Sequence, residues 1–413
     1  MTDSLLNGYR GLDLTDAKGL FCGKILATIG VETIKIEKPE GDPARHIPPF
    51  YEDISSPRKS LYWETYNTNK RSITLNLENS RGQDLFKELI KTADFLLESF
   101  PPGYLDRIGL GYDDLCQINP GVVMTSITPF GQKGPYSHYK GCDLVISAMS
   151  GVMENTGYPD RPPLKESLEA CYYIGNAAAA FGTILAHHYR QITGQGQQVD
   201  VSLQEVAVCR NSINLMLWEF EKRLIDRIGV GNRYGSVLVT SVWPCKDGHI
   251  SWALFGGTLG ADSNRALSQW IDDDGEDNPF REVTNWDELN LAEIGQEKVD
   301  DFEVAIGDFF MRHTKQEIAE EGLRRGINAA VINNPADILE NIQLNSRDFW
   351  EEMQHPELGI ALPYPKYFFL SNLTENFVKN RAPLIGEDNQ AIYVNELGLS
   401  GTEIKSLKET GVI

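Results

Sequence analysis

Apolar and polar residues alternate near the N-terminus in a pattern that predicts strands and helices in turn. Leu12 and Leu14 alternate with polar neighbours, residues 20–29 carry apolar side chains at helical spacing, and residues 33–36 form a second β-branched run. The order strand, helix, strand returns at residues 72–77, 85–90 and 93–97. Because strands separated by amphipathic helices pair in parallel, this pattern predicts an α/β protein.

The pattern continues with a buried strand at residues 122–127 and a small-residue helix that Gly194 ends. The pattern of apolar and polar residues changes after a glycine-rich stretch near residues 227–234. Beyond it, predicted polar helices and an acidic loop replace the alternation of strands and helices. A chain of 413 residues is also long for one core. We therefore predict two domains, with the second extending to about residue 328.

The amino-acid composition argues against several kinds of binding partner and site. The net charge of −21 argues against nucleic acid, and no apolar run approaches the roughly 18 residues that a membrane helix needs. The N-terminal segment lacks the basic and apolar regions of a secretory signal, so a cytoplasmic location is expected. Six cysteines without a CxxC pair argue against a zinc site and against a disulfide framework.

Basic residues gather near predicted turns between residues 67 and 107. Lys70 and Arg71 precede one strand, and a Pro-Gly turn leads to Arg107. In a chain this acidic, such local clusters are what an extended anionic ligand would need. The opening strand–helix–strand segment is Rossmann-like, but its turn has Gly19 alone and no GxGxxG, so a dinucleotide ligand is not expected.

Several motifs occur together in one order: VETIKIEKPEGDPAR, NTNKRSITL, FGQKGPY, TGQGQQVD, HPELG and RAPLIGE. With them the chain resembles the family III CoA-transferases, which include formyl-CoA and carnitine CoA-transferases and the α-methylacyl-CoA racemases. The resemblance extends from about Gly8 to Ile413. It implies a large Rossmann-like α/β domain built from both chain ends (1–227 and 329–413), a smaller inserted α+β domain (228–328), and two subunits that interlock.

The resemblance also implies that CoA or acyl-CoA is a substrate, with no tightly bound cofactor and no metal. Basic side chains suit the CoA phosphates, and an aromatic ring suits the adenine or pantetheine. The positions that carry over as CoA contacts are Lys38, Asn67, Asn69, Lys70, Arg71, Ser99, Phe100, Arg107 and Lys140.

The catalytic position departs from the family pattern. Transferases of this family use an aspartate that attacks the acyl-CoA carbonyl, forms a mixed anhydride and then an enzyme thioester. The matching position here is Tyr172, or Cys171 in a longer register, and the nearest acid is Glu169. The sequence does not match a racemase either. Cys142 occupies the position at which the racemases have the histidine that works with the acid in proton transfer. No catalytic residue can be assigned with the family chemistry.

Three hypotheses follow from this departure. In the first, the chain is a silent subunit beside a catalytic paralogue, as in the heteromeric succinyl-CoA:(R)-benzylsuccinate CoA-transferases of anaerobic aromatic degradation, with succinyl-CoA as donor. In the second, it is a self-sufficient homodimeric transferase that uses Glu169. In the third, it is a non-enzymatic acyl-CoA binding protein.

Overall fold

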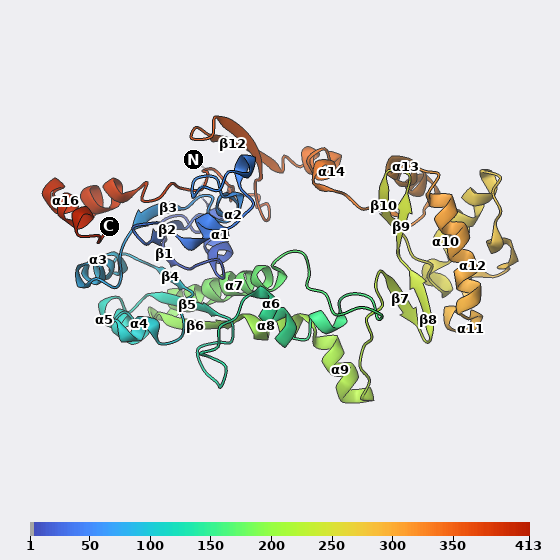
Figure 1. The fold of residues 1–413 in the computed structure, drawn as a ribbon, viewed down its shortest axis with the longest axis horizontal. Helices are drawn as coiled ribbons and strands as arrows, with labels where there is room; N and C mark the ends of the chain where they lie inside the picture. Colours follow the sequence, from blue (N-terminus) through green and yellow to red (C-terminus); the bar gives the residue numbers. More distant parts are fainter. Residues whose placement is uncertain (1–3) are drawn as a thin grey trace. The chain divides into compact units, whose positions relative to one another are not determined.

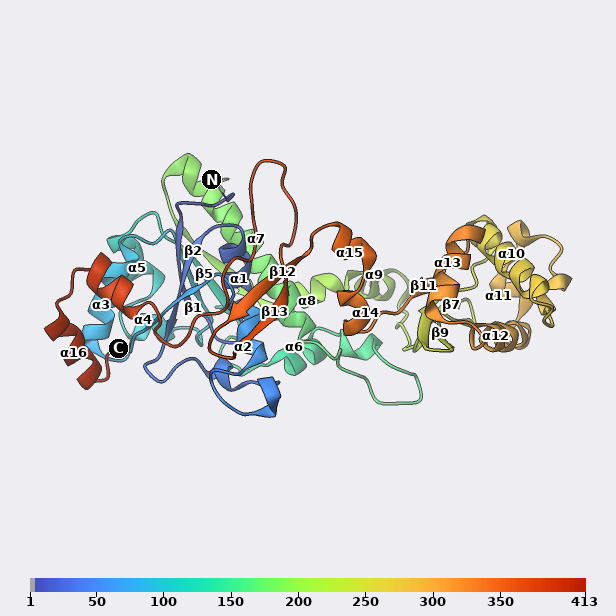
Figure 2. The same ribbon diagram turned by 90° about the horizontal axis from the view of Figure 1, so that it is seen from above.

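The structure is a computed structural model and describes residues 4–413. The chain forms two compact units. The first, here called the sheet unit, comprises Met1–Val152, Lys165–Glu221 and Gln343–Ile413; the second, the insert unit, comprises Met153–Leu164 and Lys222–Ile342. Both ends of the chain therefore contribute to the sheet unit, which Figures 1 and 2 show in blue, green and red.

The sheet unit is built on six parallel strands in the order β3-β2-β1-β4-β5-β6. Their bounds are β1 Arg10–Leu14, β2 Glu32–Glu37, β3 Arg71–Thr74, β4 Phe95–Glu98, β5 Val123–Thr128 and β6 Gln197–Ser202. This order confirms the predicted α/β class and its Rossmann-like topology. Its direction reverses between β1 and β4, which is where open parallel sheets usually bind ligands.

Helices cover both faces of this sheet. The helices of this unit are α1 Leu20–Thr28, α2 Leu61–Tyr66, α3 Ser80–Ile90, α4 Tyr104–Arg107, α5 Tyr112–Ile118, α6 Asp143–Met149, α7 Ala170–Thr193 and α8 Leu203–Arg210, with short 3₁₀ turns at Pro43–His46 and Tyr51–Asp53. A further helix, α9 Ser212–Glu221, has no buried residue and does not cover the sheet. Leu12 and Leu96 pack on the α3 side, whereas Phe95 and Leu97 pack on the α7 side. Alternate side chains of a strand point to opposite faces, so one buried sheet supports two hydrophobic cores.

The C-terminal segment returns to the sheet unit. It contains the hairpin β12 Trp350–His355 and β13 Ile360–Pro365, the π-helical turn η6 Gln390–Glu396, and α16 Gly401–Glu409. Leu407 and Ile413 complete the core that Leu85 and Phe86 of α3 form, and both views show α16 beside α3. This packing explains why a segment so far along the chain belongs to the first unit.

The insert unit has its own core of tryptophan, phenylalanine and aliphatic side chains. Its strands are β7 Gly231–Tyr234, β8 Val237–Thr240, β9 Val242–Cys245, β10 Gly248–Ser251 and β11 Ala330–Val331. Its helices are α10 Gly257–Asp273, α11 Leu291–Ile294, α12 Gln296–Phe310, α13 Lys315–Arg325 and α14 Pro335–Leu339, with 3₁₀ turns at Met153–Asn155, Pro279–Glu282 and Trp286–Glu288; α15 Ile342–Ser346 begins at the boundary. No helix within residues 4–413 is long and apolar enough to span a bilayer.

Candidate active site

Two adjoining cavities lie at the carboxyl ends of β1, β2 and β4 in the sheet unit. Their volumes are about 200 Å³ and 240 Å³, and Phe100 lines both. Lys38 lines the first cavity, while Ser99 and Lys140 line the second. We call this pair of cavities the edge groove. It occupies the point where the strand order reverses, so the fold itself favours a ligand here.

Local contacts fix the shape of the edge groove. The Ser99 hydroxyl donates to Asp16 Oδ1 at 2.8 Å and accepts the Asp16 N–H at 2.8 Å, which ties the end of β4 to the turn after β1. The ring of Phe100 stacks on Tyr104 with centroids 4.6 Å apart. Arg107 lies one helical turn further on, with its guanidinium 5.8 Å from the Tyr104 ring.

Four of the nine predicted contact residues line the edge groove, namely Lys38, Ser99, Phe100 and Lys140, and Arg107 lies beside the groove next to Tyr104. Lys38, Arg107 and Lys140 are exposed there, and the ion pairs identified among residues 4–413 do not involve them. The first cavity also has acidic lining residues, Asp16, Glu37, Asp42 and Glu78. Lys140 of the second cavity is therefore the better placed cation for a phosphate, and Phe100 lies beside the space for an apolar arm.

The other four predicted contacts are engaged inside the protein. The Lys70 ammonium is buried 2.8 Å from Asp13 Oδ2 and 2.9 Å from Asn67 Oδ1. Asn69 donates to the Phe377 carbonyl at 2.8 Å and accepts the Lys379 N–H at 2.7 Å, so it holds the returning C-terminal segment. Arg71 is paired with the carboxylates of Glu32, Asp388 and Glu396. These contacts give the four residues structural roles at the N-terminal side of β3.

A buried charge network underlies the groove. Asp13 lies between Lys70 and Lys35, whose ammonium groups are 2.8 Å and 3.9 Å from its carboxylate. Burial alone would raise the pKa of Asp13, but the two lysines outweigh burial and keep that pKa below its usual value. Gly23 of α1 makes room for this pair, because a Cβ there would lie 2.3 Å from Asp13 Oδ2.

A separate pocket is lined by Tyr172, one of the two residues predicted at the nucleophile position of the family. Tyr62 and Tyr66 reach it from α2, and Tyr172 and Tyr173 from the first turn of α7. The Tyr66 and Tyr173 hydroxyls are hydrogen bonded, and Phe21 packs edge-on against the Tyr173 ring. We call this the tyrosine pocket. Its free volume is about 10 Å³, close to the minimum for one water molecule, so it has no room for an acyl group.

The titratable groups of the tyrosine pocket are poorly suited to nucleophilic attack. Burial raises the pKa of Tyr172 above its ordinary value near 10, with nearby carboxylates adding to the effect. Burial and Asp143 raise the pKa of Cys171 to about 11, so its thiol stays protonated at neutral pH. Glu169 precedes α7 and lines the pocket, where its Oε2 accepts a hydrogen bond from the Tyr62 hydroxyl at 2.9 Å.

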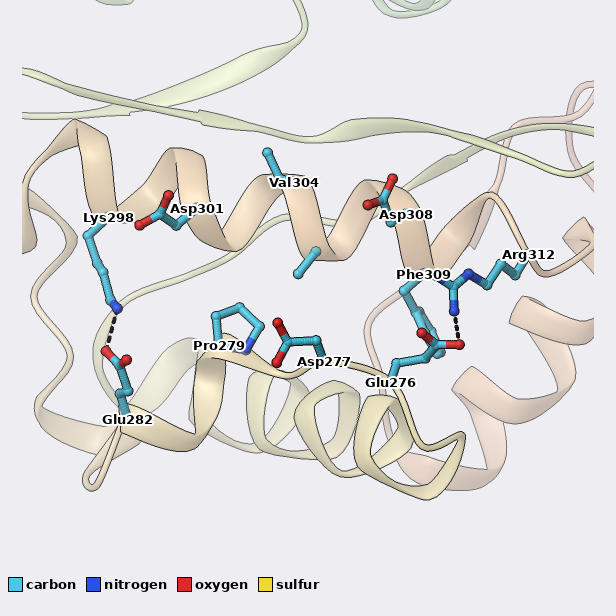
Figure 3. Close-up of a pocket in the computed structure, with 11 residues that line it drawn as sticks. Glu276, Asp277, Pro279, Glu282, Lys298, Asp301, Val304, Asp308, Phe309 and Arg312 are labelled. Carbon is cyan, nitrogen blue, oxygen red and sulfur yellow. Dashed lines mark hydrogen bonds and ion pairs between the residues drawn. The ribbon is translucent and has the colours of Figure 1, made fainter.

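A cavity of about 360 Å³ in the insert unit is also lined mainly by acidic side chains (Figure 3). Its acidic lining consists of Glu276, Asp277, Glu282, Asp301 and Asp308. Its two cations are already paired, Lys298 with Glu282 and Arg312 with Glu276. Because both of its cations are paired, whereas among the described residues Lys38 and Lys140 of the edge groove are not, this cavity is less suited than the groove to the phosphates of CoA.

Some residues of these sites carried no local sequence signal. Lys18 lines the groove, and Tyr62 and Tyr66 line the tyrosine pocket, yet none belongs to a recognisable motif. The four-residue spacing of the two tyrosines places them on one helical face, which is the only hint in the sequence. Glu98, buried at the end of β4, was also missed because carboxylates at strand ends are common.

The comparisons with known proteins agree with one another. A family model described as CoA-transferase family III matches residues 6–389. Succinyl-CoA:(R)-benzylsuccinate CoA-transferase subunit BbsE from Thauera aromatica is 31% identical over 406 residues, or 98% of this chain and 97% of that protein. A formyl-CoA:oxalate CoA-transferase from Streptomyces coelicolor is 30% identical over 435 residues, or 100% of both chains. The crystal structure of a CAIB/BAIF family protein from Brucella suis has the same fold, with a TM-score of 0.82 and 24% identity over 95% of this chain and 99% of that one.

Proposed function

The chain belongs to CoA-transferase family III, and from that premise we propose that it is a subunit of a transferase without a nucleophile of its own. In this proposal CoA passes from an acyl-CoA donor to a carboxylic acid, and an aspartate-bearing paralogue supplies the nucleophile. The observation that carries the proposal is the tyrosine pocket, where aromatic rings surround Tyr172, the residue predicted at the position of the attacking carboxylate, and leave almost no free space.

The chemistry of the family explains why this substitution silences the site. A carboxylate oxygen attacks the thioester carbonyl and CoA leaves as thiolate; the thiolate then attacks the enzyme's own carbonyl in the mixed anhydride and releases the donor acid. A phenol can accept an acyl group but offers no carbonyl for the second attack. Tyr172 therefore cannot carry CoA on the enzyme, whatever the pKa of its hydroxyl.

The relative from Thauera aromatica supports the choice of substrates and of assembly. Its name describes a subunit that belongs to a succinyl-CoA:(R)-benzylsuccinate CoA-transferase. On that basis we propose succinyl-CoA as donor and an aryl-substituted dicarboxylate such as benzylsuccinate as acceptor. The edge groove is proposed as the binding site for CoA, with Lys38 and Lys140 of its lining and the adjacent Arg107 near the phosphates, and Phe100 beside the apolar arm.

An apolar surface on the sheet unit supports a partner chain. Phe181, Leu185 and Ile192 lie along one face of α7 and are 64%, 51% and 73% exposed, and Phe220 of α9 is 83% exposed. Large apolar side chains at such spacing are typical of obligate interfaces. We propose that a paralogue of the same fold covers this surface in an interlocked assembly.

A second function is favoured by one contact. Glu169 lines the tyrosine pocket beside Tyr172, and its Oε2 is oriented by the Tyr62 hydroxyl. If α7 shifted so that this carboxylate reached the substrate carbonyl, the chain would be a self-sufficient homodimeric transferase. The two functions differ in whether the isolated chain forms a covalent intermediate.

Chemical trapping of a covalent enzyme intermediate distinguishes the silent subunit from the self-sufficient transferase. Isolated chain is incubated with succinyl-CoA and then with hydroxylamine or borohydride, and the peptide that contains Glu169 is analysed by mass spectrometry. We expect no adduct in the wild type, and none in the matched variant Glu169→Gln. An adduct on Glu169 that the variant lacks would overturn the silent-subunit proposal in favour of the homodimer.

A further inference from the structure

Three side chains that have no part in the proposed transfer converge beneath α2 in the sheet unit. Glu64 comes from α2, His355 ends β12, and Glu357 follows in the hairpin turn. One ligand atom from each lies within 4.8 Å of the others. Glu64 is 6% exposed and His355 is fully buried, so this cluster is an interior feature and not a patch of surface acids.

The contacts within the cluster leave one oxygen without a hydrogen bond. His355 Nδ1 is 3.1 Å from Glu357 Oε1 and 3.8 Å from Glu64 Oε2. Glu64 Oε2 is buried and has no hydrogen-bond partner among the described residues. Buried carboxylate oxygens are normally satisfied, because an unpaired one loses its hydration without replacement. The free oxygen faces the histidine nitrogen, so a missing partner would fit between them.

Neighbouring side chains orient the other two groups. The Tyr364 hydroxyl is 3.1 Å from His355 Nε2, and the Arg381 Nε is 3.3 Å from Glu357 Oε2. When Nε2–H donates to Tyr364, the lone pair of Nδ1 is directed at the two carboxylates. Arg381 engages only the outer oxygen of Glu357, which leaves Oε1 available. Such secondary contacts are the usual support for metal-binding histidines and carboxylates.

We propose that Glu64 Oε2, His355 Nδ1 and Glu357 Oε1 bind a divalent transition-metal cation of the zinc type, with water completing the shell. Metal–ligand bonds of about 2.0–2.1 Å in a tetrahedral site separate ligand atoms by roughly 3.4 Å, and two of the observed separations, 3.1 Å and 3.8 Å, bracket that value. Two carboxylates also neutralise the charge of such an ion.

The cation would have a structural effect. It would link α2 to the C-terminal segment that carries β12, two parts of the sheet unit that are distant in sequence. The opposite face of α2 carries Tyr62 and Tyr66, so the same link would fix one wall of the tyrosine pocket.

The test compares zinc binding by three full-length proteins in equilibrium dialysis, with thermal unfolding as a second measurement. They are the wild type, Glu64→Gln, and the control Glu352→Gln, which removes an exposed carboxylate from the same strand as His355. Glutamine has nearly the same shape as glutamate, so this variant should fold. All cysteines and all other surface acids are the same in the three proteins, so zinc bound by them is also the same. A difference in zinc content between Glu64→Gln and the other two proteins therefore reports the proposed site.

We expect the wild type and Glu352→Gln to bind one more equivalent of Zn²⁺ than Glu64→Gln. Zinc should raise the melting temperature of the first two and leave that of Glu64→Gln unchanged. Equal zinc content in all three proteins would overturn the proposal, as would a melting temperature that zinc shifts equally in all of them. A lower zinc content in Glu352→Gln than in Glu64→Gln would show surface binding only and would also contradict it.

Discussion

Glu98 is the residue whose environment most clearly couples stability to pH. It is buried at the end of β4, and its Oε2 accepts the Phe100 N–H at 2.7 Å. Burial raises the pKa of Glu98 to about 7, although contacts with Ser126 and Phe100 oppose the increase. Because the folded pKa exceeds the unfolded value of 4.5, the folded state binds more protons between about pH 4.5 and pH 7. Stability should therefore fall as pH rises through that window.

Glu98→Gln should remove this dependence. Near pH 4 the variant and the wild type should be similarly stable, whereas at pH 8 the variant should be more stable by up to about 3 kcal/mol. Urea unfolding at several pH values measures the difference, with the exposed Glu88→Gln as control. A variant that is less stable than the wild type at pH 8 would show that the folded protein stabilises the Glu98 carboxylate, and would contradict a raised pKa for this group.

The exposed cations of the edge groove lead to a second prediction. If Arg107 and Lys140 contact CoA phosphates, replacing either with alanine should weaken CoA binding by about 1.5–3 kcal/mol, or roughly tenfold to 150-fold. The effect should shrink as salt increases, because these groups are exposed. Calorimetric titration with CoA measures both, and Lys91→Ala beyond the end of α3 is the control. Equal affinities in all variants would place the phosphates elsewhere.

At the scale of elements, the network of Asp13, Lys35 and Lys70 joins β1, β2 and the turn before β3. Asp13→Asn would leave the buried Lys70 ammonium without its paired carboxylate, whereas Lys35 would keep Asp42 at 3.0 Å. Removal of one partner from a buried ion pair typically costs about 3–5 kcal/mol, and we expect a loss of that size in denaturant unfolding. The exposed Asp113→Asn should change stability by less than about 0.5 kcal/mol. A similarly small change for Asp13→Asn would contradict the network's role.

The same network illustrates which features of the protein could not be predicted from the sequence. The strands were predictable because buried parallel strands leave a local signal, as at Leu12 and Leu14 in β1. The burial of Lys70 could not be predicted from the sequence, because its partner Asp13 lies 57 residues earlier. The tyrosine pocket was hidden for the same reason, since Tyr62 and Tyr172 come from separate helices that only the fold brings together. The sequence predicts that the nucleophile position lacks a carboxylate. That aromatic rings fill the space around Tyr172 could not be predicted from it.

At the scale of the whole molecule, charge and apolar surface bear on assembly. A net charge of −21 opposes pairing of two identical chains through long-range repulsion, while the apolar faces of α7 and α9 require a cover. A less acidic paralogue of the same fold would satisfy both conditions. The heteromer is thus favoured by electrostatics as well as by the state of the tyrosine pocket.

The most direct test is native mass measurement of this chain co-expressed with a paralogue that has the aspartate, together with an assay of CoA transfer from succinyl-CoA. The proposed function predicts a 1:1 heteromer that is active, and an isolated chain that is poorly soluble or inactive. A stable homodimer of this chain that transfers CoA by itself would contradict the account.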